Sequence, residues 1–485
     1  MLSVESKKVT KYDIFLLSFL ILITLIDSSS ISMLCQLLLL CKAVFVKKTD
    51  LTGIKELIIA SLLGVEIVLI IFPILYFFSY IVFRNGRINQ GYHKPYLFIL
   101  IYAMIVAAYS SVSEFLPLNI IVWVLMFSTP FCYYFYAMEW NSNDNEKKKL
   151  LVFIELILLI EILCVFYQGI TGIGFVPNDL FKGTLRDAHK LGLLFFIFVF
   201  YGCYLFKDTS YKIIGICIVI LSLFVERWSD SKAILLSAAV ASVIIVHLCV
   251  FYRKKFHVLL ELREALFILT IGYFTLAYLI LFKADVFNSV YDFFEPYVDG
   301  ALTDSKYKMY VRVWHDIFIQ HPFEWFFGTG PGTLASRASN MFSSDVLKAG
   351  NALSDYIISS SSWTRIYMDG LFTNEIIENI KWVSAVLTYP FSGFISLKGE
   401  LGLLGLFLYI SVIYKLSSPL LKNRSNEPIS AFKLGLFISV FVFIVALLFD
   451  NYHEQLAISS IFFVLVGVFT NERTTDAQLE NNYPN

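Results

Sequence analysis

The chain has 485 residues, of which 58% are hydrophobic and only 16% are charged, and its formal net charge is zero. A soluble globular domain carries about 25% charged residues, so this composition excludes an ordinary soluble protein. A chain without net charge has no bulk attraction to nucleic acid, and we expect no nucleic-acid partner. The composition predicts an integral membrane protein.

About a dozen apolar segments follow one another along the chain. Most have close to the roughly 20 residues that a helix needs to cross the hydrocarbon layer. The first segment contains Asp27 and a run of serines, and a tight hairpin there would give thirteen spans instead of twelve. We expect an all-α polytopic membrane protein with about twelve transmembrane helices at residues 13–40, 57–82, 95–112, 118–137, 150–168, 190–206, 212–226, 232–252, 264–283, 397–415, 430–449 and 455–470.

One connection, residues 284–396, is far longer than the others. Lys and Arg gather in the connections of the opposite side, for example at residues 147–149 and 253–255, which predicts that this opposite side is cytoplasmic. The long connection is then a large, partly helical outer loop. The chain divides into N-terminal transmembrane helices (1–283), this loop (284–396), C-terminal transmembrane helices (397–470) and a disordered cytoplasmic tail (471–485).

Two short outer connections combine cations with polar residues. Residues 182–192 contain Arg186, His189 and Lys190 where the chain enters a helix, and residues 226–233 contain Arg227 and Lys232. Backbone N–H groups at a helix N-terminus suit an anion when cations lie beside them. Anchoring at the lipid headgroups is the alternative for each connection. Two such connections on one face favour an anion site.

The outer loop contains an expected amphipathic helix at residues 311–322, with Arg312 and His321. Glycines at 328, 330 and 332 follow and permit a tight backbone path toward a phosphate or a sugar, with a plain loop as the alternative. His315 and His321 have no third ligand at metal spacing, so no metal site is expected.

Three carboxylates lie inside the expected spans, at Glu66, Glu155 and Glu161. An ionisable group inside a membrane is costly and can mark an ion path. These three are scattered and have no partner in the sequence pattern. We interpret them as neutral or interfacial carboxylates.

The ordered set of motifs resembles the superfamily of O-antigen polymerases (Wzy type) and O-antigen ligases. Residues 183–192 resemble the family loop that ends in P-N-x-L-G, with Ala188-His189 in place of Pro-Asn, and Lys232 stands where the family carries an arginine. Arg312, Trp314, Pro322 and the three glycines resemble a stretch of the family's large outer loop. Glu400-x-Gly402-x-x-Gly405 resembles the motif that closes it.

The resemblance implies a membrane glycosyltransferase. These enzymes act on glycans carried by a polyprenyl (undecaprenyl) diphosphate at the outer face of the bacterial inner membrane, with the large loop in the periplasm. The ligases carry a histidine shortly before the motif glutamate, where this chain has Pro390-Phe391. This difference favours a polymerase that joins repeat units into a surface polysaccharide such as the O-antigen of lipopolysaccharide.

Such a reaction needs cations to stabilise the departing diphosphate and a base to accept the proton of the acceptor hydroxyl. The candidate cations are Arg186, Lys190, Arg227, Lys232 and Arg312. The candidate bases are His189, His321 and Glu400. Trp314, Trp325 and Trp363 are candidate sugar platforms, with packing of the loop as an equal alternative.

The resemblance implies no cofactor and no metal. The expected partners are the lipid-linked oligosaccharide, membrane lipid, a flippase and a chain-length regulator. One alternative is an O-antigen ligase that transfers the glycan to lipid A-core. The alternative from a different class is a transporter of lipid-linked oligosaccharides.

Overall fold

The computed structural model describes residues 9–26, 28–46, 50–83, 90–140, 143–173, 181–207, 211–229, 234, 236–241, 309–341, 361–367, 392–421, 428–448 and 450–471. Every regular element among these residues is a helix. The predicted all-α class is therefore confirmed. The expected span 264–283, most of the span 232–252, Lys232, and the tail beyond Asn471 lie outside the described residues.

The N-terminal helices before the outer loop are α1 (Lys11–Ile26), α2 (Ser29–Cys41), α3 (Leu51–Leu62), α4 (Glu66–Leu69), α5 (Phe72–Phe83), α6 (Gln90–Ser110), α7 (Pro117–Glu139), α8 (Asp144–Gln168), α9 (Ala188–Lys207) and α10 (Lys212–Trp228). Short π-helical turns follow α2 and α8, at Lys42–Val46 and Gly169–Ile173.

We call residues 309–341 and 361–367, which are described parts of the long connection 284–396, the cap segment. It contains a π-helical turn at Arg312–Asp316 and the short helices α16 (Ile317–Gln320), α17 (Pro322–Phe327), α18 (Arg337–Met341) and α21 (Ser362–Tyr367). The C-terminal helices are α23 (Gly393–Ser417), α24 (Pro428–Ala446) and α25 (Leu456–Thr470), with a 3-10 turn at Ser418–Leu421.

Five described helical segments are long and apolar enough to cross a membrane: His93–Ser110, Pro117–Glu139, Asp144–Thr171, Ala188–Phe206 and Gly393–Leu421. Four shorter apolar segments are Ser29–Phe45, Glu66–Val82, Phe432–Ala446 and Leu456–Thr470. These long apolar helices agree with a membrane protein.

The structure divides the first two expected spans. Residues 13–40 form α1 and α2, and Ser28 caps the N-terminus of α2. Residues 57–82 are interrupted after α3 by Gly64, whose backbone is left-handed at φ 73°. Sixteen residues of α1 extend only about 24 Å, less than the ~30 Å hydrocarbon layer. One continuous span is therefore not confirmed in either region, and the break near Asp27 lies where the sequence allowed a hairpin.

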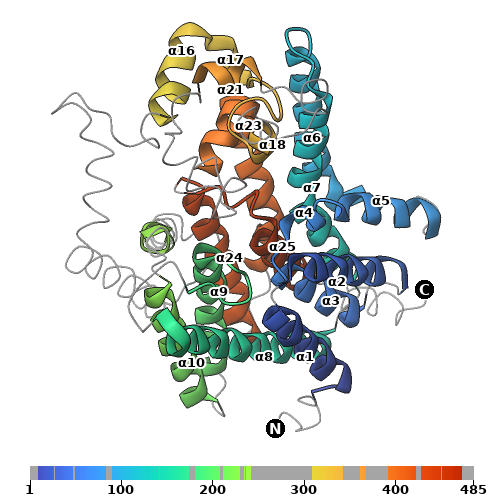
Figure 1. The fold of residues 1–485 in the computed structure, drawn as a ribbon, viewed down its shortest axis with the longest axis vertical. Helices are drawn as coiled ribbons and strands as arrows, with labels where there is room; N and C mark the ends of the chain where they lie inside the picture. Colours follow the sequence, from blue (N-terminus) through green and yellow to red (C-terminus); the bar gives the residue numbers. More distant parts are fainter. Residues whose placement is uncertain are drawn as a thin grey trace, which may run out of the picture.

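Figure 1 shows how the helices are arranged. Helices α6 and α23 run along the long axis of the molecule, whereas α8 runs across its lower end (Figure 1). The cap helices α16, α17 and α21 gather at the upper end, beside the start of α23 (Figure 1). The described helices therefore do not form one set of parallel rods.

The three glycines of the cap segment fit against α23 and the neighbouring helices. Gly328, Gly330 and Gly332 all have positive φ, at 101°, 113° and 74°. The backbone N–H groups of Thr329 and Gly330 donate to the carbonyl oxygens of Gly399 and Glu400, each at 3.0 Å. The backbone path is tight, as the glycines permit, and the surface that it approaches here is the backbone of α23.

Gly402 completes this contact from the side of α23. Its φ of 71° and ψ of 179° kink the helix, and an added Cβ would clash with the carbonyl oxygen of Phe326. Only glycine adopts this backbone conformation at low cost. The three glycines of the cap segment and Gly402 therefore allow the cap segment to pack closely against α23.

Gly402→Ala is expected to destabilise the protein by more than the about 1–2 kcal/mol that a left-handed backbone costs a non-glycine residue, because the Cβ clash adds to it. Thermal unfolding of the purified protein in detergent measures this. Leu404→Ala is the matched control, since Leu404 lies on the same helix and is 42% exposed. Equal melting temperatures for the two variants would contradict a role of Gly402 in holding the cap segment against α23.

Candidate functional site

The loop before α9 fixes where that helix begins. Glu161 on α8 accepts hydrogen bonds from the backbone N–H of Thr184, at 2.9 Å, and from its hydroxyl. Asp187 Oδ1 accepts from the backbone N–H groups of His189 and Lys190, at 2.9 and 3.1 Å. Asp187 therefore caps the N-terminus of α9. The cap places Lys190 in the first turn of the helix.

A second loop carries an arginine into the interior. The backbone N–H groups of Gly332, Leu334 and Ser336 donate to the Glu400 carboxylate at 3.0, 3.1 and 3.0 Å. Arg337 follows immediately, begins α18 and is 1% exposed. Because three N–H groups converge on one carboxylate of α23, the chain path into Arg337 is fixed.

Lys190 and Arg337 meet at Glu66, the first residue of α4. Lys190 Nζ lies 2.6 Å from Glu66 Oε1, and Arg337 Nη1 donates to Glu66 Oε2. Asp187 Oδ2 lies 3.8 Å from Lys190 Nζ. Segments far apart in sequence thus bring two cations and two carboxylates together. Since Lys190 and Arg337 are buried, solvent screens these ion pairs little.

The turn between α24 and α25 lies against Arg337. Glu454 Oε2 accepts from the backbone N–H of Arg337 at 2.7 Å, and the Glu454 carbonyl oxygen accepts from Nη1 at 3.0 Å. Burial, aided by Glu400, raises the pKa of Glu454 to about 8, although hydrogen bonds and the charge of Arg337 oppose this. Burial, and then Arg337, lower the pKa of His453 to about 3. Burial therefore disfavours the charged form of both side chains.

Two nitrogen atoms of Arg337 have no partner among the residues that the structure describes. Within the described residues, Nε and Nη2 are buried and have no hydrogen-bond partner. A buried polar group without a partner costs about 1–3 kcal/mol, so this edge of the guanidinium is a place where a ligand gains binding energy. Two parallel N–H groups match two oxygen atoms of a phosphate or carboxylate. The geometry suits an anion.

Three sequence-predicted residues lie at this cluster or on its loop. Lys190 forms the ion pair with Glu66. His189 is half-buried, and its Nδ1 has no partner in the described part of the chain. Arg186 donates from Nη2 to Ser32 Oγ at 3.3 Å and has a left-handed φ of 57°. Such a backbone is uncommon for a non-glycine residue and persists where the surroundings hold it.

The other predicted site residues lie elsewhere. Arg312 Nη1 donates to the Tyr367 carbonyl oxygen at 2.9 Å within the cap segment. The His321 ring packs edge-on against Trp363, with centroids 4.9 Å apart. Arg227 is in α10, but its side chain is outside the described atoms, as is all of Lys232.

Glu400 binds backbone N–H groups with both oxygen atoms and is fully buried. A base must reach the hydroxyl from which it takes a proton. The geometry therefore assigns Glu400 a structural role in holding the loop, and it does not favour the predicted role as a base.

Two of the candidate sugar platforms pack against the protein itself. Trp325 Nε1 donates to the Trp314 carbonyl oxygen at 3.0 Å, and the two rings meet edge to face. Lys398 Nζ lies over both rings, 5.2 and 4.7 Å from their centroids, and donates to the Val313 carbonyl oxygen at 2.5 Å. The packing interpretation is therefore the better one for this pair.

Sequence reasoning missed Arg337 and Glu454 and interpreted Glu66 as neutral or interfacial. Glu66 is instead ion-paired, and the other two carboxylates inside expected spans also have partners: Tyr201 for Glu155 and Thr184 for Glu161. The polar run of residues 450–455 between two apolar segments could have indicated Glu454.

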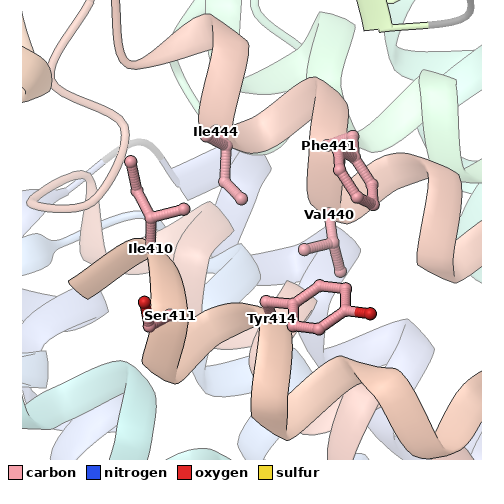
Figure 2. Close-up of a pocket in the computed structure, with 6 residues that line it drawn as sticks. All are labelled: Ile410, Ser411, Tyr414, Val440, Phe441 and Ile444. Atoms are coloured by element: carbon pink, nitrogen blue, oxygen red, sulfur yellow. The ribbon is translucent and has the colours of Figure 1, made fainter. Parts of the chain in front are cut away.

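The other candidate sites have less support for binding a ligand. A pocket between α23 and α24 is lined by Ile410, Ser411, Tyr414, Val440, Phe441 and Ile444 (Figure 2). It has no charged side chain, so it offers no counter-charge to an anion. The described residues contain no group of three His, Cys, Asp or Glu side chains that could hold a metal ion.

Comparison with protein-family models, with curated proteins and with solved structures found no match for this chain.

Proposed function

We propose that this protein is a membrane glycosyltransferase that polymerises polyprenyl-diphosphate-linked repeat units into a surface polysaccharide. The observation that carries the proposal is Arg337, a buried arginine with the unpaired Nε–Nη2 edge described above, next to the cation Lys190. Two buried cations beside apolar helices suit a ligand that combines phosphate charge with a lipid chain. The motif resemblance points to the same carrier.

In the proposed reaction, the oxygen of an acceptor sugar hydroxyl attacks the anomeric carbon of the donor glycan. A new glycosidic C–O bond forms while the bond from that carbon to the diphosphate oxygen breaks, and the diphosphate leaves with the electron pair. Arg337 and Lys190 stabilise the charge that develops on the leaving group. Because these cations are already held in place, little reorganisation accompanies the transfer.

The hydroxyl proton needs a base close to these cations. His189 adjoins Lys190 in the first turn of α9, and its Nδ1 is unpaired in the described part of the chain. We therefore favour His189 over the other two sequence candidates, since Glu400 is occupied by backbone N–H groups and His321 packs in the cap segment.

Deletion of the gene in its host tests the proposal. Lipopolysaccharide and extracted lipid-linked glycans are separated on a gel, and the full-length gene on a plasmid is the control. We expect the ladder to collapse to core plus a single repeat unit. Bare core with polymer still on the lipid carrier would indicate a ligase instead. A loss of all outer-face lipid-linked glycan would indicate a transporter, and an unchanged ladder would refute the O-antigen assignment.

A further inference from the structure

Arg337 presents two distinct edges, and only one of them is occupied. Its Nη1 is shared by the Glu66 carboxylate and the Glu454 carbonyl oxygen. Its Nε and Nη2 have no partner in the described residues. A single phosphate group can bind the Nε–Nη2 edge while Glu66 stays where it is.

A second phosphate would need the place that Glu66 holds. The Glu66 carboxylate is bound by Lys190 Nζ, at 2.6 Å, and by Arg337 Nη1 at the same time. A phosphate bonded to a first one on the Nε–Nη2 edge would need cations of its own, and Lys190 Nζ and Arg337 Nη1 are already engaged by Glu66. Two anions in a buried site repel each other strongly, so the phosphate and the carboxylate exclude one another.

We propose that Glu66 is a resident competitor for the second phosphate position of a diphosphate ligand. In the unliganded protein it pairs with both Lys190 and Arg337, and a diphosphate must displace it. The inference rests on the proposed function for the identity of the ligand. It adds a role in release: the polyprenyl diphosphate product leaves as the Glu66 carboxylate takes Lys190 and Arg337 back.

The position of Glu66 permits such a displacement. Glu66 begins the four-residue helix α4, which follows the left-handed Gly64 and the extended residue Val65. Its N-cap residue Val65 makes no side-chain capping hydrogen bond. A change in the side-chain direction of Glu66 therefore breaks no long helix.

Calorimetric titration of the purified full-length protein with inorganic pyrophosphate and with inorganic phosphate tests the inference. Glu66→Gln removes the competing charge and keeps the side-chain shape. We expect pyrophosphate to bind about tenfold tighter or more, since one buried like-charge contact is worth at least the roughly 1.4 kcal/mol of a tenfold change. Phosphate affinity should change much less.

Glu155→Gln is the matched control, because Glu155 accepts a hydrogen bond from Tyr201 on α9 at 2.8 Å and is not paired with Lys190 or Arg337. It should leave both affinities unchanged. Glu66→Asp, which keeps the charge, should give a pyrophosphate affinity between those of the wild type and Glu66→Gln, and it serves if Glu66→Gln does not fold.

An unchanged or smaller ratio of pyrophosphate to phosphate affinity in Glu66→Gln would overturn the inference, and so would the absence of pyrophosphate binding in all variants. These outcomes are separate from the gel assay. A normal gel result with an unchanged ratio would leave the polymerase proposal standing and remove the role of Glu66.

Discussion

Arg337→Ala is expected to lower the rate of glycan transfer by about 10²–10³, the effect of removing one preorganised donor from a developing negative charge. The assay is polymer formation by the purified protein from lipid-linked repeat units. Arg337→Lys should recover only part of the rate, because an ammonium group supplies a point charge without the two-pronged geometry of the guanidinium.

Arg337→Ala also removes a partner of Glu66 and of Glu454. Breaking a buried ion pair from one side costs about 3–5 kcal/mol, so this variant may only be interpreted beside a measurement of folding. Arg337→Lys keeps the charge and is expected to remain folded. A lysine variant that melts near the wild type and still loses most activity would separate the electrostatic role from the structural one.

Arg365→Ala is the matched control for this series. Arg365 lies on α21 in the same outer loop, its side chain is 60% exposed, and its Nη2 is 3.9 Å from Glu114. An exposed pair of this kind contributes about 0–1 kcal/mol. Full activity in Arg337→Ala, or an equal loss in Arg365→Ala, would contradict the assignment of the site to Arg337.

The apolar pattern predicted the helices better than it predicted their interruptions. The expected spans 95–112, 118–137 and 190–206 correspond to α6, α7 and α9. The break at Gly64 was not predicted, because a glycine within an apolar run is compatible with a continuous helix. A Cβ on Gly64 would lie 3.3 Å from the Leu185 carbonyl oxygen in the loop before α9, so the break coincides with a tertiary contact that the local pattern does not encode.

The candidate site was predicted only in part, because its residues meet through contacts between distant segments. Lys190 stood out because it follows a polar loop at the start of an apolar helix. Arg337 lies among small residues in the long connection 284–396, where an arginine normally faces solvent. Its burial depends on Glu400, Glu454 and Glu66, which come from three other segments. No local pattern encodes such a meeting of segments.

The geometry of Glu400 favours a role other than the predicted one. Its spacing from Gly402 and Gly405 marked it as part of a motif, and the chemistry of the reaction suggested a base. The structure shows a carboxylate that three backbone N–H groups surround. Both interpretations expect a variant to lose activity, so the activity alone does not distinguish them.

Glu400→Gln distinguishes the two roles through stability. The amide replaces one acceptor oxygen by an NH2 group, which faces backbone N–H donors and leaves them unpaired. Hydrogen bonds to a charged group are worth about 1.5–3 kcal/mol each, so we expect the free energy of unfolding to fall by about 3 kcal/mol or more. Thermal melting in detergent measures the change, with Glu324→Gln on α17 as the control.

The same variant should weaken pyrophosphate binding, because the Glu400 carboxylate fixes the loop that carries Arg337. A base would behave differently: its loss slows transfer but leaves both the melting temperature and the affinity for pyrophosphate at wild-type values. That outcome would restore Glu400 as a catalytic candidate. A lower melting temperature together with weaker binding would instead mean that the motif glutamate serves the reaction by holding an arginine in place.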